Sequence, residues 1–428
     1  MNQDKYRSYV EILREELIPA MGCTEPIALA YCAAKAWAVS GGGSPEALAS
    51  ASVCVSGNII KNVKSVIVPN TGGLRGIETA VAAGIASGQV DRRLEVLSAL
   101  SKEQQAQIPA LLDRGIIQVR PAQNDKLLYI EVALTRLDGA QAKVVLEGAH
   151  TNITWVERNG QVLYQGEVSA ARPEGKLNHS VLNVQDIVTF ADTVGLSDIE
   201  PLVGRQLAYN LAIAEEGLTQ NWGANVGKTI RRVYGDDVKF LARAYAAAGS
   251  DARMSGCELP VVIVSGSGNQ GITASVPIAI YAQHMGASRE RLLRAVALSD
   301  LVTIHQKTGI GCLSAFCGAV CAGCGAGAGI AYLQGGDYTV IAHTIVNTLA
   351  ILSGMVCDGA KPSCAAKIAE AIDAGILGYE MYRNGQEFLD GDGIVCKGVD
   401  NTIVNVGRMA KTGMRETDKV ILEIMCGC

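Results

Sequence analysis

An uncharged stretch runs from Thr308 to Gly336 and consists mostly of glycine, alanine and cysteine. A stretch of this length reaches the threshold for a membrane-spanning helix. Membrane helices, however, owe their insertion energy to leucine, isoleucine, phenylalanine and valine, which are scarce here. Small residues at helical spacing also allow helices to pack closely against one another. We therefore expect this stretch to lie in a protein core rather than in a lipid bilayer.

Cysteines are concentrated in and just after this stretch, where six of the chain's 13 lie between Cys312 and Cys364. On a helix, Cys317, Cys321 and Cys324 would share one face. A straight helix cannot wrap three neighbouring side chains around one compact metal centre. We expect Cys312, Cys321 and Cys324 to be small apolar fillers, as free cysteines usually are. A metal site would take one cysteine from this helix and others from elsewhere.

The segment from Cys357 to Cys364 could supply the other cysteines. Its glycine and proline predict a loop, and a helix follows it. Unpaired N–H groups and the positive end of the dipole at a helix start favour thiolates and anions. The alternative is a structural turn that contains two incidental cysteines.

Composition excludes some classes of function. With 49% apolar and 18% charged residues, a chain of 428 residues should be globular and form two or three domains. The net charge of -5 without a basic block argues against nucleic-acid binding. The polar N-terminus has no signal-peptide pattern, and an odd number of cysteines without such a signal indicates a reducing, cytoplasmic location without disulfides.

The residue pattern predicts an α+β fold, in which a smaller α/β domain is inserted after the N-terminal helices. Residues 1–45 should form N-terminal helices that pack on the helical domain. Alternating strand patterns and turn residues predict the α/β domain at 46–172. Helical periodicity dominates 173–428, which we expect to form the larger, predominantly helical domain.

Two glycine-rich loops could bind a small anion through backbone N–H groups. The first follows a predicted strand at Asn70 and Thr71, and a plain turn explains it equally well. The second precedes the apolar helix at 272–284, so its N–H groups should face whatever binds at the helix start. The candidate residues of this second loop are Ser265, Gly266, Ser267, Gly268, Asn269 and Gln270.

Four further residues are candidates for catalysis. Cys23 lies in an irregular segment just ahead of an apolar helix, where thiolate character is favoured. His150 is one of only five histidines and stands at a strand end near Asn152, although a structural role is the alternative. Lys307 and Lys361 flank the cysteine-rich stretch and are the next candidates for a base.

Four motifs carry a resemblance to a known family: Met21-Gly-Cys-Thr-Glu-Pro-Ile-Ala-Leu-Ala, Ser265-Gly-Ser-Gly-Asn-Gln-Gly, Ser314-Ala-Phe-Cys-Gly and Cys357-Asp-Gly-Ala-Lys. Together they resemble the L-cysteine desulfidase family, which is related to the alpha chain of iron–sulfur L-serine dehydratases. The resemblance covers nearly the whole chain, with the motifs in the right order.

The resemblance implies a lyase that works without pyridoxal phosphate and holds a [4Fe-4S] cluster, one iron of which is not ligated by protein. It implies cluster ligation by Cys317 and Cys357, with either Cys23 or Cys364 as the third ligand. Cys23 would otherwise be a catalytic thiol. The resemblance also implies that the loop at 265–271 binds the substrate carboxylate, and a His-x-Asn element makes His150 the first candidate for the general base.

The expected reaction is therefore the conversion of L-cysteine and water to pyruvate, ammonia and hydrogen sulfide in a helical iron–sulfur catalytic domain. L-serine dehydratase is the alternative enzyme. A non-catalytic metal-binding or redox-sensing protein is the alternative class. The expected partner is a small amino-acid substrate, a homodimer remains open, and neither nucleic acid nor a membrane is expected.

The C-terminus contains Cys426 and Cys428. By analogy with related iron–sulfur serine dehydratases, the apolar run at 420–425 would dock on the helical domain and bring Cys428 towards the cluster. Chance is the alternative explanation.

Overall fold

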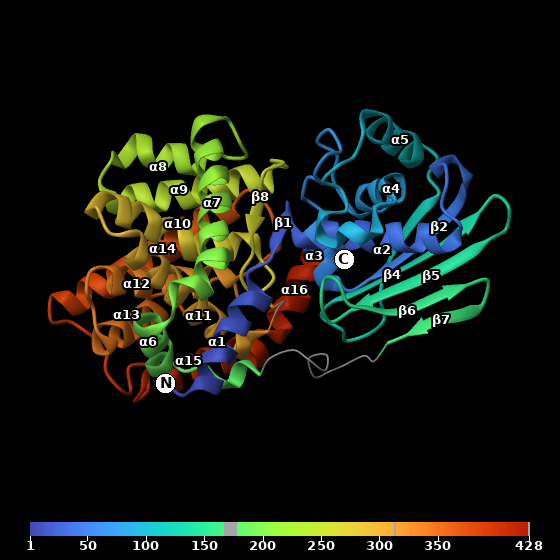
Figure 1. Cartoon of the computed structure of the whole chain (residues 1–428). Coiled ribbons are helices and arrows are strands. Elements are labelled where there is room, and N and C mark those ends of the chain that lie inside the picture. Colours follow the sequence, from blue (N-terminus) through green and yellow to red (C-terminus); the bar gives the residue numbers. More distant parts are fainter. Residues whose placement is uncertain (167–177, 312–313, 427–428) are drawn as a thin grey trace.

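The computed structural model describes residues 1–166, 178–311 and 314–426. Within these ranges the chain builds two large hydrophobic cores, one inside a helical unit and one beneath a six-stranded sheet. Figure 1 shows the helical unit on the left and the sheet unit on the right. The predicted α+β class, with helices predominating in the larger unit, is confirmed.

The sheet has the strand order β3-β2-β4-β5-β6-β7. β2 pairs in parallel with β3, and the other neighbours are antiparallel. Buried and part-exposed residues alternate along β4, as expected when one face of a sheet is covered. The strands are β2 (Leu48–Val55), β3 (Ile117–Pro121), β4 (Tyr129–Arg136), β5 (Gln141–Glu147), β6 (Ile153–Arg158) and β7 (Gln161–Gln165). The helices of this unit are α2 (Thr24–Ser40), α3 (Gly57–Val63), α4 (Ile77–Ser87) and α5 (Lys102–Asp113).

Helix α2 corrects part of the expected organisation. Both N-terminal helices were expected to pack on the helical unit, and α1 (Gln3–Glu16) does so through Tyr9, Ile12 and Leu13. α2 instead lies in the core of the sheet unit, against α4, β4 and β5. Its residues are apolar and small on almost every side, so the helix is stable only when all its faces are buried. The sheet and α4 together bury them.

The helical unit is formed by α1 and by helices that follow residue 178. These are α6 (Val184–Thr193), α7 (Leu196–Thr219), α8 (Val226–Tyr234), α9 (Val238–Met254), α10 (Gly268–Met285), α11 (Arg289–Ile310), α12 (Gly318–Leu333), α13 (Tyr338–Ile351), α14 (Cys364–Arg383) and α15 (Val399–Arg408).

Helix α12 lies at the centre of this unit and contains most of the small-residue stretch. Its glycines allow other helices to approach its backbone. A Cβ atom on Gly327 would lie 2.6 Å from the carbonyl oxygen of Gly375 in α14, and one on Gly325 would lie 2.4 Å from Thr303 Oγ1 in α11. Cys321 and Cys324 are completely buried fillers, whereas Cys312 lies outside the described residues. Among the described residues, no helix has the length and apolar character needed to cross a membrane.

A short two-stranded sheet connects distant parts of the chain. β1 (Pro19–Met21) pairs antiparallel with β8 (Pro260–Val262), so that Met21 lies opposite Pro260. The segment that leads into α2 is thereby held against the segment that leads into α10. The loop at 22–23, before α2, and the loop at 265–267, before α10, are more than 200 residues apart in sequence. The pairing of β1 with β8 brings them together at the seam between the two units.

The last helix, α16 (Arg415–Cys426), lies at the same seam (Figure 1). The expectation that the run at 420–425 docks on the helical domain is corrected, because α16 packs against α3 of the sheet unit. A Cβ atom on Gly57 would lie 2.4 Å from Leu422 Cδ1, so a larger residue at position 57 would force the Leu422 side chain to move. Cys428 lies outside the described residues.

Candidate functional site

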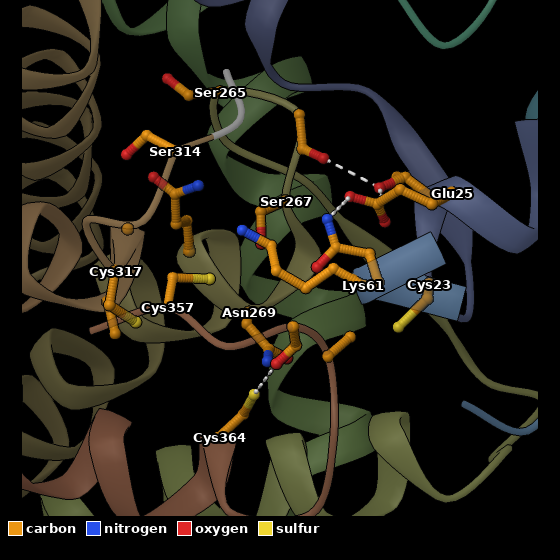
Figure 2. A pocket seen from close by; sticks show the side chains of 18 of the residues that line it. Cys23, Glu25, Lys61, Ser265, Ser267, Asn269, Ser314, Cys317, Cys357 and Cys364 are labelled. Carbon is orange, nitrogen blue, oxygen red and sulfur yellow. Dashed lines mark hydrogen bonds between the residues drawn. The ribbon is translucent and has the colours of Figure 1, made fainter. Parts of the chain in front are cut away.

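A cavity of about 110 Å³ lies at the seam between the sheet unit and the helical unit. Side chains from both units line it (Figure 2). It brings together most of the residues singled out from the sequence: Cys23, His150, Ser265, Gly266, Ser267, Asn269, Gln270, Lys307, Cys317, Cys357 and Cys364.

Two cysteines on one wall are held together by their backbones. Phe316 and Val356 form an isolated antiparallel bridge, and the N–H of Cys317 donates to the carbonyl of Met355 at 3.0 Å. The N–H of Cys357 donates in return to the segment that precedes Cys317. The two thiols therefore lie side by side, as Figure 2 shows.

The environment of these thiols favours anionic sulfur. A hydrogen bond from Cys317 lowers the pKa of Cys357 to about 6, helped by the charges of Lys61 and Lys307 and by the Gly359 N–H, while burial opposes the shift. The hydrogen bond to Cys357, together with burial, raises the pKa of Cys317 well above its ordinary value. The pair thus shares one proton, and the buried Lys61 and Lys307 stabilise the negative charge that remains.

Cys364 belongs to the same wall. It is the first residue of α14, and its thiol donates to the carbonyl of Gly359 at 3.6 Å. Burial raises the pKa of Cys364, and the nearby Cys357 raises it further, while the Lys361 backbone opposes this shift. A charge on Cys364 likewise raises the pKa of Cys317. The three thiols are therefore near enough to one another to interact electrostatically.

Cys23 lies on the opposite side of the cavity from the Cys317–Cys357 pair (Figure 2). Its Sγ is 3.8 Å from Met254 Sδ. Burial raises the pKa of the Cys23 thiol to about 12, and the charge of Arg253 only partly offsets this. Cys23 is therefore a neutral thiol that faces the wall of three cysteines.

The cysteine wall suits an iron–sulfur cluster better than a single ion. In the parts of the chain that the structure describes, no three histidine, cysteine or acidic side chains are arranged to hold one metal ion. A [4Fe-4S] cluster is larger and takes thiolate ligands that are further apart. Cys317, Cys357 and Cys364 offer three thiols on one wall, with lysines close by. This donor set fits such a cluster.

The second glycine loop forms another side of the cavity. Ser265 and Gly266 both adopt positive φ values, 48° and 78°, and Val264 and Ser267 close the turn with mutual backbone hydrogen bonds of 3.1 Å. The loop leads directly into α10, which begins at Gly268. The first turn of this helix has unpaired N–H donors and the positive end of the dipole, so it can bind an anion.

Glu25 and His150 meet on the sheet-unit side of the cavity. His150 Nε2 lies 3.9 Å from Glu25 Oε1, which also accepts a hydrogen bond from Asn62 at 3.2 Å. Burial alone would raise the pKa of Glu25, but His150 and the Thr24 hydroxyl outweigh it and hold the pKa below its ordinary value. His150 Nε2 is buried without a hydrogen-bond partner in the described structure, so it can exchange a proton with a bound molecule.

Three of the predicted binding residues do not line the cavity. Asn70 Nδ2 donates to the Leu97 carbonyl at 2.8 Å, and Thr71 Oγ1 donates to the Val68 carbonyl at 2.7 Å. These bonds stabilise their own turn, which corrects the expectation that Asn70 and Thr71 bind substrate. Gly268 lies behind the cavity surface, where its missing side chain makes room for a neighbour.

The cavity also contains charged or polar residues that had not been predicted from the sequence: Glu25, Lys61, Asn62 and Arg253. Glu25 stands beside Cys23 inside a recognised motif, so the motif could have indicated it. Arg253 is near the end of the alanine-rich helix α9, where the residue pattern indicates only a buried face.

Comparisons with known proteins bear on this arrangement. Residues 91–423 match the family described as serine dehydratase alpha chain. The match covers well over half of the chain, including the three clustered cysteines and the loop that leads into α10. This family supports an iron–sulfur lyase of the dehydratase type.

Related proteins match along almost their whole length. A UPF0597 protein of Desulfitobacterium hafniense is 53% identical over 424 residues, which cover 99% of this chain and 97% of that protein. A UPF0597 protein of Lachnoclostridium phytofermentans is 47% identical and covers 98% of this chain and 99% of its own. One from Treponema denticola is 44% identical, with 99% of both chains covered.

Proposed function

Because the chain belongs to the serine dehydratase alpha chain family, we propose that it is an iron–sulfur lyase acting on L-cysteine. The reaction takes L-cysteine and water to pyruvate, ammonia and hydrogen sulfide, without pyridoxal phosphate. One observation carries the proposal: a single cavity combines three thiols, an anion-binding helix start and a histidine paired with a carboxylate.

Cys317, Cys357 and Cys364 are the proposed ligands of a [4Fe-4S] cluster. Cys364 interacts electrostatically with both Cys317 and Cys357, and this supports Cys364 as the third ligand. Cys23 interacts with Cys364 and contacts Met254 instead. When bound, a cluster with one iron not ligated by protein supplies a Lewis acid for the departing group.

The loop that ends in α10 orients the substrate in this proposal. The N–H groups at the start of the helix hold the α-carboxylate and stabilise the negative charge that develops when the Cα proton leaves. The cavity is small, and the residues that line it are buried or half-buried, which would limit the access of bulk water to the reacting atoms.

His150 is the proposed general base. The Cα proton is weakly acidic, so a positioned base must remove it. The imidazole of His150 would accept this proton, and the Glu25 carboxylate, 3.9 Å from Nε2, would stabilise the imidazolium. Cys23, whose raised pKa keeps its thiol protonated, would line the substrate site as a neutral group. The aminoacrylate product then hydrolyses without the enzyme.

L-Serine dehydratase is the second candidate, and the description of the matched family favours it. The Cys23 thiol in the cavity lining favours L-cysteine instead, because a polarizable sulfur suits a substrate thiol better than a hydroxyl. The two activities differ only in the group that leaves from the β-carbon.

The test is a steady-state assay of anaerobically purified protein, after iron and sulfide have been quantified. We expect broad visible iron–sulfur absorption and equal amounts of pyruvate and sulfide from L-cysteine. Much faster turnover of L-serine would favour the dehydratase. An intact cluster without pyruvate from either amino acid would contradict both activities and indicate a non-catalytic metal-binding or redox protein.

A further inference from the structure

Arg253 lines the cavity but has no counter-charge. It is 3% exposed, and its Nη1 donates to Asn269 Oδ1 at 3.1 Å. Its Nε is buried without a hydrogen-bond partner, and no carboxylate pairs with the guanidinium anywhere in the described ranges. A buried charge without a partner is costly. In the same helix, the similarly buried Arg243 pairs with Glu370 and Asp373.

The fold makes room for the guanidinium beside the anion-binding loop. A Cβ atom on Gly268 would lie 2.4 Å from Arg253 Nε, so any larger residue would displace the guanidinium from this position. Asn269, the next residue, orients the planar group through its side-chain oxygen. The guanidinium is therefore held at the start of α10, where neutral N–H donors already favour an anion.

The other cations of the cavity, Lys61 and Lys307, already interact with negatively charged groups of the protein. Lys61 forms an ion pair with Asp418. Both Lys61 and Lys307 lower the pKa of Cys357, although less than its hydrogen bond from Cys317 does. Arg253 instead lowers the pKa of Cys23, which contacts the neighbouring Met254. The positive charge of Arg253 thus lies on the side of the cavity away from the three-cysteine wall. A bound ligand would supply the negative charge that the described residues do not offer to it.

We propose that Arg253 binds the α-carboxylate of an amino-acid ligand and thereby determines the specificity of the cavity for amino acids. A guanidinium presents parallel N–H donors that match the two oxygens of a carboxylate. Asn269 acts as the positioning residue, and Gly268 provides the space. Only the class of ligand, an amino acid, is taken from the proposed function.

The test measures binding rather than turnover. L-Alanine keeps the α-amino and α-carboxyl groups but has no group to eliminate, and L-alaninol has the same skeleton without the carboxylate. Calorimetric titration of the iron-loaded protein under anaerobic conditions should show that wild type binds L-alanine about 10²-fold more tightly than L-alaninol. Arg253→Met should weaken L-alanine binding by about 10²-fold and leave L-alaninol binding unchanged, and Arg253→Lys should be intermediate.

Arg243→Met is the matched control, because Arg243 is a buried arginine on the same helix with its own acidic partners. It should lower Tm yet keep the preference for L-alanine. Arg253→Met should not lower the Tm of the ligand-free protein, because it removes an unpaired buried charge. The proposal is overturned if Arg253→Met retains the preference, if it weakens both ligands equally, or if wild type binds neither. Absence of lyase activity would instead refute the proposed function, and the binding test would still decide whether Arg253 binds the carboxylate.

Discussion

Lys61 on α3 and Asp418 on α16 form an ion pair across the seam, with 2.5 Å between Nζ and Oδ1. The Lys61 side chain is 1% exposed and lines the cavity. The C-terminal helix therefore neutralises a cation of the site, although it lies 357 residues away in the chain.

Asp418→Asn should lower the free energy of unfolding by about 3 kcal/mol, because it leaves Lys61 buried without its partner. Thermal or urea unfolding measures the loss. The double variant Lys61→Met/Asp418→Asn should recover most of it. Glu416→Gln, which alters an exposed pair with Lys419, should have little effect. Equal stability of Asp418→Asn and wild type would show that the pair contributes nothing.

Replacement of Cys317, Cys357 or Cys364 by alanine should each abolish retention of the cluster, because two remaining thiolates leave it under-coordinated. Iron and sulfide content after anaerobic purification is the measurement. Cys321→Ala is the control: Cys321 is fully buried in α12, so this change should affect packing and leave the iron content intact. Full iron content in any of the first three variants would remove that cysteine from the ligand set.

His150→Gln should lower kcat by about 10²-fold or more while the iron content is unchanged, because the proton acceptor is lost. His305→Gln is a suitable control. His305 pairs with Asp400 at 2.7 Å and does not line the cavity, so turnover should stay close to that of wild type. A wild-type kcat in His150→Gln would leave the base unassigned and make Lys307 the next residue to test.

Asp300 in α11 predicts a pH-dependent stability. Burial raises the pKa of this carboxyl from 3.8 to about 8, which a hydrogen bond from Gln206 offsets only in part. The folded state thus prefers the protonated acid, and this preference costs stability as pH rises from about 4 towards 8. Asp300→Asn should therefore be more stable than wild type at pH 8, by on the order of 2 kcal/mol.

The stabilisation by Asp300→Asn should shrink steadily as the pH is lowered towards 5. Comparison of Tm for both proteins between pH 5 and 9 tests this expectation. A difference in Tm that does not change with pH would show that the Asp300 carboxyl is not protonated in the folded protein.

Gly327→Ala should destabilise the helical unit by about 1–3 kcal/mol, because its Cβ would lie 2.6 Å from the Gly375 carbonyl oxygen and push α12 away from α14. Gly354→Ala is the matched control, since nothing lies within 4 Å of the added Cβ there. Denaturant unfolding should separate the two variants. Equal stabilities would show that the α12–α14 contact can relax at little cost.

Much of the fold follows from local sequence. The small residues at 308–336 indicate a closely packed helix, and α12 confirms this because glycine and alanine leave the backbone open to neighbouring helices. The same reasoning correctly predicts Cys321 and Cys324 as buried fillers. The Cys357–Cys364 segment is a loop that leads into α14, as its glycine and proline indicate.

Tertiary structure decides what periodicity cannot. A buried face does not reveal its partner, so the sequence alone could not show that α2 belongs with the sheet or that α16 packs on α3. The sequence says still less about ion pairs. Nothing near Arg253 in the chain indicates that its guanidinium has no carboxylate partner, and nothing near Lys61 indicates that its partner is Asp418. The sequence by itself determines which residue types are available for chemistry and which segments are buried. The pairing of β1 with β8 and the docking of the two units decide which of those residues meet, because their contacts join segments hundreds of residues apart.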